Sequence, residues 1–147
     1  CIEDLPQTKT EENKEEVEHG YETILLVEDE PAILKMGKIM LESLGYKVLT
    51  ADLPIKAINI AKEHAGEISL LITDVVMPEI SGKDLAQDIL PNIIPKIKCL
   101  FMSGYTAEVI ARDGLLDEGM NFLQKPFSRN ELAAKVRNIL NRPNISI

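Results

Sequence analysis

Five short apolar runs, each followed at once by polar or turn residues, limit the fold of this chain more than any other feature. They cover residues 23–27, 46–50, 69–73, 99–102 and 121–123. Short apolar runs bounded by turn signals are typical of strands buried on both faces, whereas 46–50 alternates enough for a strand near a sheet edge. The third run ends in one carboxylate, Asp74, which we place at the carboxyl end of a central strand, where open α/β sheets bind ligands. Taken alone, Asp74 fits a turn aspartate equally well.

Between these runs, apolar residues recur at helical spacing. The pattern predicts five helices: from Pro31 to Gly45, from an Asp52 cap to about His64, from Ser81 to Pro91, a short one from Thr106, and one from Ser128 to Leu140. Ser81 with Asp84, and Ser128 with Glu131, have the spacing of capping boxes. Five strands that alternate with five helices predict an α/β fold, in which a parallel sheet carries helices on both faces.

The composition fits one domain with an aliphatic core. The chain has 147 residues, of which 45% are hydrophobic and only 4% aromatic. No apolar run approaches the roughly 18 residues of a membrane span, so we expect no membrane contact by this segment. Two cysteines provide no disulfide framework, which fits a reducing cytoplasm.

Negative charge is concentrated at the N-terminus. The net charge is −8, and residues 1–20 hold seven acidic residues against two lysines. This balance disfavours a direct nucleic-acid partner. Residues 1–21, acidic and poor in aliphatics, are typical of a solvated, flexible linker. Because the chain begins with Cys1 rather than Met, we expect it to be a piece of a longer protein.

Polar side chains follow four of the five predicted strands. Glu28 and Asp29 come after the first, Asp74 after the third, Ser103 after the fourth and Lys125 after the fifth. Adjacent strands lie about 4.8 Å apart, so three carboxylates would share one pocket if the first and third strands are neighbours. Carboxylates about 4 Å apart repel by several kcal/mol at intermediate dielectric. Such a cluster either retains a proton or binds a cation.

Mg²⁺ suits this set, because it is held by one or two carboxylates together with phosphate oxygens. Lys125 adds a positive charge and Ser103 a hydroxyl donor. With Asp74 as the nucleophile, the set predicts a phosphoryl-transfer site. Each residue alone has an ordinary explanation at a helix end, a turn or the surface. Their concentration at four strand ends of one sheet favours the site.

Residues 22–142 resemble the receiver domain of two-component response regulators, leaving the linker and a tail of residues 143–147 outside. The resemblance rests on motifs in matching order and spacing: Glu28-Asp29, Asp74 followed by Met77-Pro78 and Gly82, Ser103-Gly104, and Lys125-Pro126. It implies a flavodoxin-like (βα)5 three-layer sandwich, with a five-stranded parallel sheet of order 2-1-3-4-5 along the chain.

The resemblance implies roles for the acidic residues. Asp74 matches the phosphoacceptor. Glu28, Asp29 and Asp74, with the backbone carbonyl of Val76, match the Mg²⁺ ligands. The family more often has Asp where this chain has Glu28, and we expect the longer side chain of Glu28 to reach the metal only through water.

Further residues match the family's response to phosphorylation. Ser103 matches the hydroxyl that bonds the phosphoryl group, and Lys125 the cation that pairs with it. The Lys125-Pro126 peptide is expected to be cis, as in the family. Phe122 occupies the position of the family's switch aromatic residue, where Tyr is common. Ordinary core packing explains an aromatic residue at this position equally well.

These matches predict a phosphorylation-controlled switch. A phosphohistidine of a histidine kinase or histidine phosphotransfer domain would donate to Asp74. The surface formed by the helix from Thr106, the strand at 121–123 and the helix from Ser128 would then change shape. The same surface is a candidate contact for a homodimer. The donor lies on another domain or chain, since His19 and His64 lack the acidic follower of the family's donor histidine.

Other functions fit less well. A phosphatase of the haloacid dehalogenase type needs an acid where Val76 stands, and dinucleotide binding needs a glycine-rich loop after the first strand. An interaction module that no longer takes phosphate is the serious alternative, although the intact acidic pair argues against it. Val76 and Tyr105 stand where the family shapes water's approach, and their apolar bulk predicts slow self-hydrolysis.

The acidic linker before the receiver resembles the arrangement in hybrid sensor histidine kinases, where the receiver is C-terminal. A stand-alone response regulator is the alternative. The domain itself would catalyse only its own phosphorylation and dephosphorylation. We expect it in the cytoplasm, and a parent kinase could be anchored in a membrane.

Overall fold

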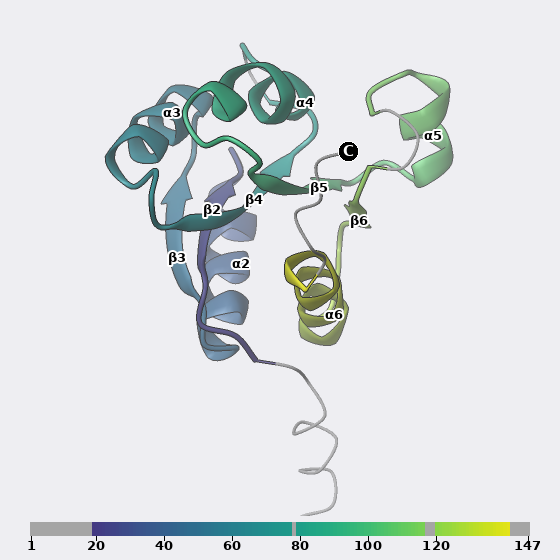
Figure 1. Cartoon of the computed structure of the whole chain (residues 1–147). Coiled ribbons are helices and arrows are strands. Elements are labelled where there is room, and N and C mark those ends of the chain that lie inside the picture. Colours follow the sequence, from purple (N-terminus) through teal and green to yellow (C-terminus); the bar gives the residue numbers. More distant parts are fainter. Residues whose placement is uncertain (1–18, 78, 117–119, 142–147) are drawn as a thin grey trace, which may run out of the picture.

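The computed structural model describes residues 19–77, 79–116 and 120–141 (Figure 1). Most of the predicted linker, Pro78, and the predicted tail at 143–147 lie outside the described residues.

Within the described ranges, five strands alternate with five helical segments. They are β2 (Thr23–Val27), α2 (Pro31–Ser43), β3 (Lys47–Ala51), α3 (Pro54–Glu63), β4 (Ile68–Asp74), α4 (Gly82–Asp84) continued by the π-helix η1 (Leu85–Ile89) and the 3-10 helix η2 (Leu90–Asn92), β5 (Lys98–Ser103), α5 (Ala107–Arg112), β6 (Phe122–Gln124) and α6 (Arg129–Leu140). All strand pairs are parallel, in the order β3-β2-β4-β5-β6. This is the order 2-1-3-4-5 along the chain, and the predicted fold is confirmed.

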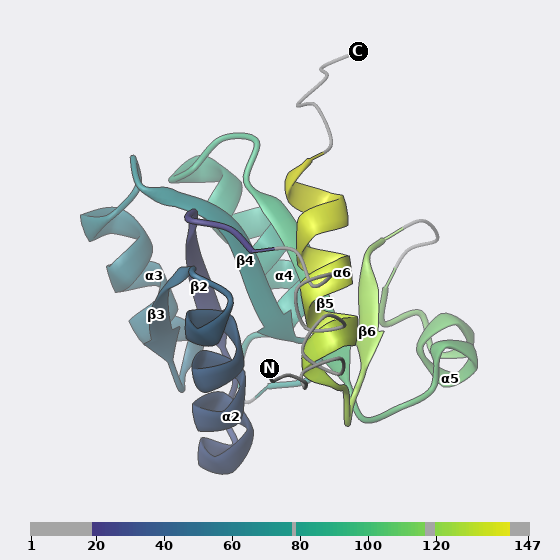
Figure 2. The same cartoon turned by 90° about the horizontal axis from the view of Figure 1, so that it is seen from below.

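Successive side chains of each strand point to opposite faces of the sheet and pack in two separate hydrophobic cores. Ile24 and Leu26 of β2 pack with residues of α2 and α6 on one face of the sheet. Leu25 and Val27 pack with residues of α3, η1 and α5 on the other face. Figures 1 and 2 show these two helical layers around the sheet. The sheet is therefore buried between the two layers. The helices cover its faces, so polar side chains lie at the ends of the strands.

Local sequence signals set most helix ends. Gly45 follows α2 with φ at +101°, a conformation that favours glycine. Ser128 and Glu131 form the predicted capping box of α6. Pro91 has no N–H to donate, and the helix before it ends in π and 3-10 turns. The Asp52 cap was wrong: Leu53 is the N-cap residue of α3, and Asp52 pairs with Lys56 at 2.9 Å instead.

No helix in the described parts of the chain is both long and apolar enough to span a membrane.

An ion pair joins the residue before β2 to α6, at the amino ends of the strands and thus at the opposite end of the sheet from Asp74. The Arg137 guanidinium donates to both carboxylate oxygens of Glu22, at 3.0 and 2.8 Å, and to the Tyr46 hydroxyl at 3.1 Å. Both charged side chains are largely buried, with 13% and 15% exposed. The hydrogen bonds from Arg137 lower the pKa of Glu22 in the folded protein.

We expect Glu22→Gln to lower the free energy of unfolding by about 2 kcal/mol at neutral pH, the usual worth of a charged bidentate hydrogen bond. Because folding lowers the pKa of Glu22, its contribution is present above the unfolded value of 4.5 and is lost as pH falls through the lower folded value. Urea unfolding of both proteins at about pH 7 and about pH 3 should show the difference shrinking. Glu42→Gln, in a half-exposed pair with Lys38, is the control and should change stability little.

Candidate phosphoryl-transfer site

The parallel register brings the predicted site residues together at the carboxyl ends of the strands. Val27 of β2 is opposite Thr73 of β4, so Glu28 and Asp74 follow neighbouring strand ends. β5 lies on the other side of β4, and β6 lies beside β5. This strand order brings Ser103 and Lys125 to the same carboxyl end of the sheet. Residues far apart in the sequence thus meet because all five strands run in one direction.

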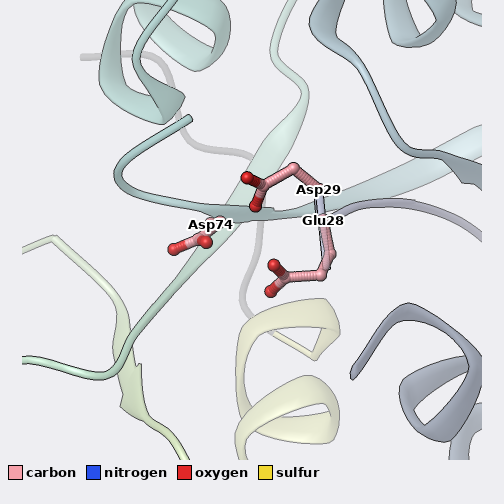
Figure 3. A group of neighbouring side chains, drawn as sticks. All are labelled: Glu28, Asp29 and Asp74. Carbon is pink, nitrogen blue, oxygen red and sulfur yellow. The ribbon is translucent and has the colours of Figure 1, made fainter. Parts of the chain in front are cut away.

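Three carboxylates form a compact acidic cluster at this end of the sheet. Oxygen atoms of Glu28, Asp29 and Asp74 all lie within 4.8 Å of one another. Figure 3 shows Glu28 and Asp29 reaching from the turn after β2 toward Asp74. Glu28 is fully buried, Asp74 is 8% exposed, and Asp29 is exposed. Two of the acids are therefore shielded from water, and the third faces it.

Lys125 neutralises part of this charge. Its Nζ donates to Glu28 Oε1 at 3.0 Å and to Asp74 Oδ2 at 3.3 Å. Burial lowers the pKa of Lys125, but the hydrogen bond to Glu28 and the nearby carboxylates outweigh this and raise it. Lys125 is therefore charged at neutral pH. The Lys125-Pro126 peptide is cis.

Glu28 is the acid least suited to its charged form. Burial, aided by the charge of Asp74, raises the pKa of Glu28 to about 7, although the hydrogen bond from Lys125 opposes the rise. The Lys125 ammonium alone is thus insufficient to keep Glu28 fully ionised near neutral pH. A second cation bound here would favour the ionised form of this carboxylate.

The residues present fit Mg²⁺. Hard carboxylate oxygens from three side chains, one of them exposed, converge on a small volume, and this ion prefers such oxygen ligands while retaining some water. Glu28, Asp29 and Asp74 would hold the ion.

Ser103 is the last residue of β5, and Val76 and Tyr105 each lie two residues beyond the ends of β4 and β5. Ser103 is 2% exposed, and its Oγ accepts the Tyr105 N–H at 3.0 Å. The backbone N–H of Lys125 donates to the Ser103 carbonyl at 2.8 Å, which joins the two residues. Val76 and Tyr105 are about half exposed. Phe122 is partly buried and packs in the core beneath α5.

Sequence reasoning missed one buried polar group. Thr73 is fully buried, and its hydroxyl donates to the backbone carbonyl of Asp74 at 3.0 Å. In the sequence Thr73 looks like another β-branched strand residue. A hydroxyl directly before the acceptor was the one available signal.

Comparison with known proteins gives a consistent result. The model of the response regulator receiver domain family matches residues 24–137. The sensor kinase CckA of Brucella abortus is 41% identical over 123 residues, covering 84% of this chain and 13% of that kinase. The chain thus spans a small part of this relative.

Solved structures agree with this match. The receiver domain from the hybrid histidine kinase CckA has a TM-score of 0.68 and 36% identity, covering 81% of this chain and 99% of that one. The receiver domain of the sensor histidine kinase PA1611 from Pseudomonas aeruginosa PAO1, solved with magnesium in its active site cleft, has a TM-score of 0.69 and 26% identity, covering 84% and 100%. This chain therefore belongs to the response regulator receiver domain family of two-component signalling.

Proposed function

We propose that Asp74 accepts a phosphoryl group from a phosphohistidine, and that Mg²⁺ assists the transfer. The observation that carries the proposal is the contact of the Lys125 ammonium with both Glu28 and Asp74, inside a cluster of three carboxylates. A lone turn aspartate needs neither a buried lysine nor two further acids around it. A phosphoryl-transfer site needs a nucleophile and several positive charges.

In the transfer, an Asp74 carboxylate oxygen forms a bond to phosphorus as the bond from phosphorus to the donor's imidazole nitrogen breaks. The electron pair of that bond stays on the imidazole nitrogen, and the ring leaves neutral because its other nitrogen carries a proton. Glu28, Asp29 and Asp74 would hold Mg²⁺, which would supply positive charge against the phosphoryl oxygens. Lys125 moves its hydrogen bond from the Asp74 carboxylate to a phosphoryl oxygen. Ser103, whose Oγ accepts the Tyr105 N–H, donates its own hydroxyl hydrogen to a second phosphoryl oxygen.

This rearrangement would reach the surface formed by α5, β6 and α6. Ser103 ends β5 and is joined to Lys125 through the backbone, while Phe122 begins β6. Repacking of Phe122 would therefore follow movement of Ser103, and the surface would change its partner contacts or pair with a second copy. A bistable element biased by a local charge acts in this way.

A hollow beside Lys125 supports a protein as the phosphodonor. It has a volume of about 300 Å³ and is lined on one side by Ile33 and Met36 of α2 and on the other by Pro126 and Phe127. Lys125 lines this hollow and also contacts Asp74, so a protein that carries the donor imidazole to Asp74 would cover it. We propose a histidine kinase or histidine phosphotransfer domain. The match to CckA favours a hybrid kinase as the parent chain.

The test uses the chain with Mg²⁺ and acetyl phosphate, followed by intact mass measurement. We expect the wild type to gain one phosphoryl group, removable by hydroxylamine as an acyl phosphate should be, and Asp74→Asn to gain none. A wild type that gains nothing, or an unchanged gain in Asp74→Asn, would overturn the proposal.

The phosphorylated form should hydrolyse slowly, over minutes or longer. Val76 and Tyr105, both half exposed beside the site, would restrict water at the phosphorus atom. We expect Val76→Ser with Tyr105→Ser to shorten the half-life about tenfold. Intact mass followed over time after removal of the phosphodonor measures it, with Ile55→Ser, a distant exposed apolar residue on α3, as the control. A wild-type half-life of seconds contradicts this prediction.

A further inference from the structure

Gly82, the first residue of α4, lies directly against the backbone of Asp74. A Cβ atom added to Gly82 would overlap the Asp74 carbonyl oxygen and lie 3.0 Å from its carbonyl carbon and 3.1 Å from Val75 Cα. Every one of these neighbours is backbone, which cannot turn aside as a flexible side chain can. The Gly82 N–H also donates to the Val75 carbonyl at 2.8 Å.

Close approach, rather than backbone conformation, explains the glycine. Gly82 does not have the positive φ that Gly45 and Gly114 have, so an L-residue could adopt its conformation. Gly66, by contrast, has no neighbour within 4 Å of an added Cβ.

The same carbonyl has a second neighbour. The fully buried Thr73 hydroxyl lies 3.0 Å from it and 3.8 Å from the Met77 Sδ, and the shorter distance makes the carbonyl the favoured acceptor. The next peptide N–H, of Val75, donates to Met102 of β5 at 2.9 Å. The peptide that follows Asp74 is thus fixed by a hydroxyl, a glycine and the neighbouring strand.

Neither side of the Gly82 contact can yield easily. Ser81 caps α4 through the Asp84 N–H at 3.0 Å, and Leu85 just beyond is fully buried. On the other side, β4 is central in the sheet, paired with both β2 and β5. A side chain at position 82 would therefore displace the Asp74 peptide or the start of α4.

We propose that Gly82 and Thr73 are positioning residues, which aim the Asp74 carboxylate at Lys125 by fixing the peptide behind it. The proposal rests on the proposed function of Asp74. The Asp74–Lys125 contact of 3.3 Å leaves little tolerance, and a misplacement of about 1 Å costs reactions about 100-fold.

The experiment compares Gly82→Ala, Thr73→Val and Thr73→Ser with Gly66→Ala as the matched glycine control. We measure the rate of phosphorylation by acetyl phosphate over a range of concentrations, the melting temperature, and the ¹³Cγ chemical shift of Asp74 without Mg²⁺. We expect Gly82→Ala to lower the maximal rate about 100-fold and Thr73→Val about tenfold, with half-saturation unchanged, while Thr73→Ser stays within about twofold because it keeps the hydroxyl. Both impaired variants should shift the Asp74 resonance, and Gly66→Ala should not.

Equal rates in Thr73→Val and Thr73→Ser, or an unmoved Asp74 resonance in a folded Gly82→Ala, would overturn the inference. Should Gly82→Ala fail to fold, the two Thr73 variants decide alone. A wild type that takes no phosphoryl group would refute the proposed function, whereas the Asp74 resonance would still show whether these residues position the carboxylate.

Discussion

Replacing Lys125 with glutamine is expected to slow phosphorylation of Asp74 by about 100-fold and to strengthen Mg²⁺ binding by about tenfold. The ammonium donates to both Glu28 and Asp74, so in the resting site it competes with Mg²⁺ for the same oxygens. Removing it leaves a more negative cluster for the metal. A unit charge about 4 Å from a divalent cation is worth about 2 kcal/mol at the dielectric constant of water. Screening by salt reduces this toward the roughly 1.4 kcal/mol of a tenfold change.

The rate falls for a different reason. As the phosphoryl group arrives, its oxygens need a fixed donor, and removal of one such donor typically costs about 100- to 1,000-fold. The two opposite changes separate this role from a general loss of structure, which would weaken both properties.

Phosphorylation rates and Mg²⁺ titrations of Lys125→Gln should be compared with Lys62→Gln, an exposed lysine in the last turn of α3. The control should behave as the wild type does. Weaker Mg²⁺ binding in Lys125→Gln, or an unchanged rate, would contradict the assigned role of Lys125.

The sequence allowed the site to be located because strand ends are easy to find. Each of Glu28, Asp74 and Ser103 follows an apolar run, and parallel strands bring such positions together regardless of side-chain detail. The strand order followed from the family resemblance, and the register then fixed which ends are neighbours.

What the sequence could not give is distance and burial. Nothing in it distinguishes Glu28, fully buried, from the exposed Asp29 beside it. The burial of Glu28 depends on tertiary contacts, such as the one with Lys125 after β6. The overlap between Gly82 and the Asp74 carbonyl likewise depends on tertiary contact. Asp52 failed as a cap for a local reason: Pro54 takes the first helical position, which makes Leu53 the cap residue.

The burial of Glu28 has a chemical consequence for metal binding by the three carboxylates. With its pKa raised to about 7 by burial, the metal-free site is a mixture of protonated and ionised forms near neutral pH. Binding of a divalent cation favours ionised oxygens and must release that proton.

Asp29→Asn is therefore expected to weaken Mg²⁺ binding about 30- to 100-fold while leaving the melting temperature of the metal-free protein nearly unchanged. A carboxylate in contact with a divalent cation contributes about 2 kcal/mol or more even at the dielectric constant of water. Since Asp29 is exposed and belongs to an acidic cluster, its replacement removes repulsion and breaks no buried contact.

Glu30→Gln provides a closely matched control, with the same charge change one residue further along. Glu30 is exposed, is not part of the three-carboxylate cluster, and makes no side-chain cap to α2. We expect its Mg²⁺ affinity to stay within about threefold of the wild type, the effect of one screened charge. Calorimetric titration with Mg²⁺ measures both variants. Equal losses in the two would mean that the cluster acts only through its total charge, whereas a loss confined to Asp29→Asn identifies Asp29 as a ligand.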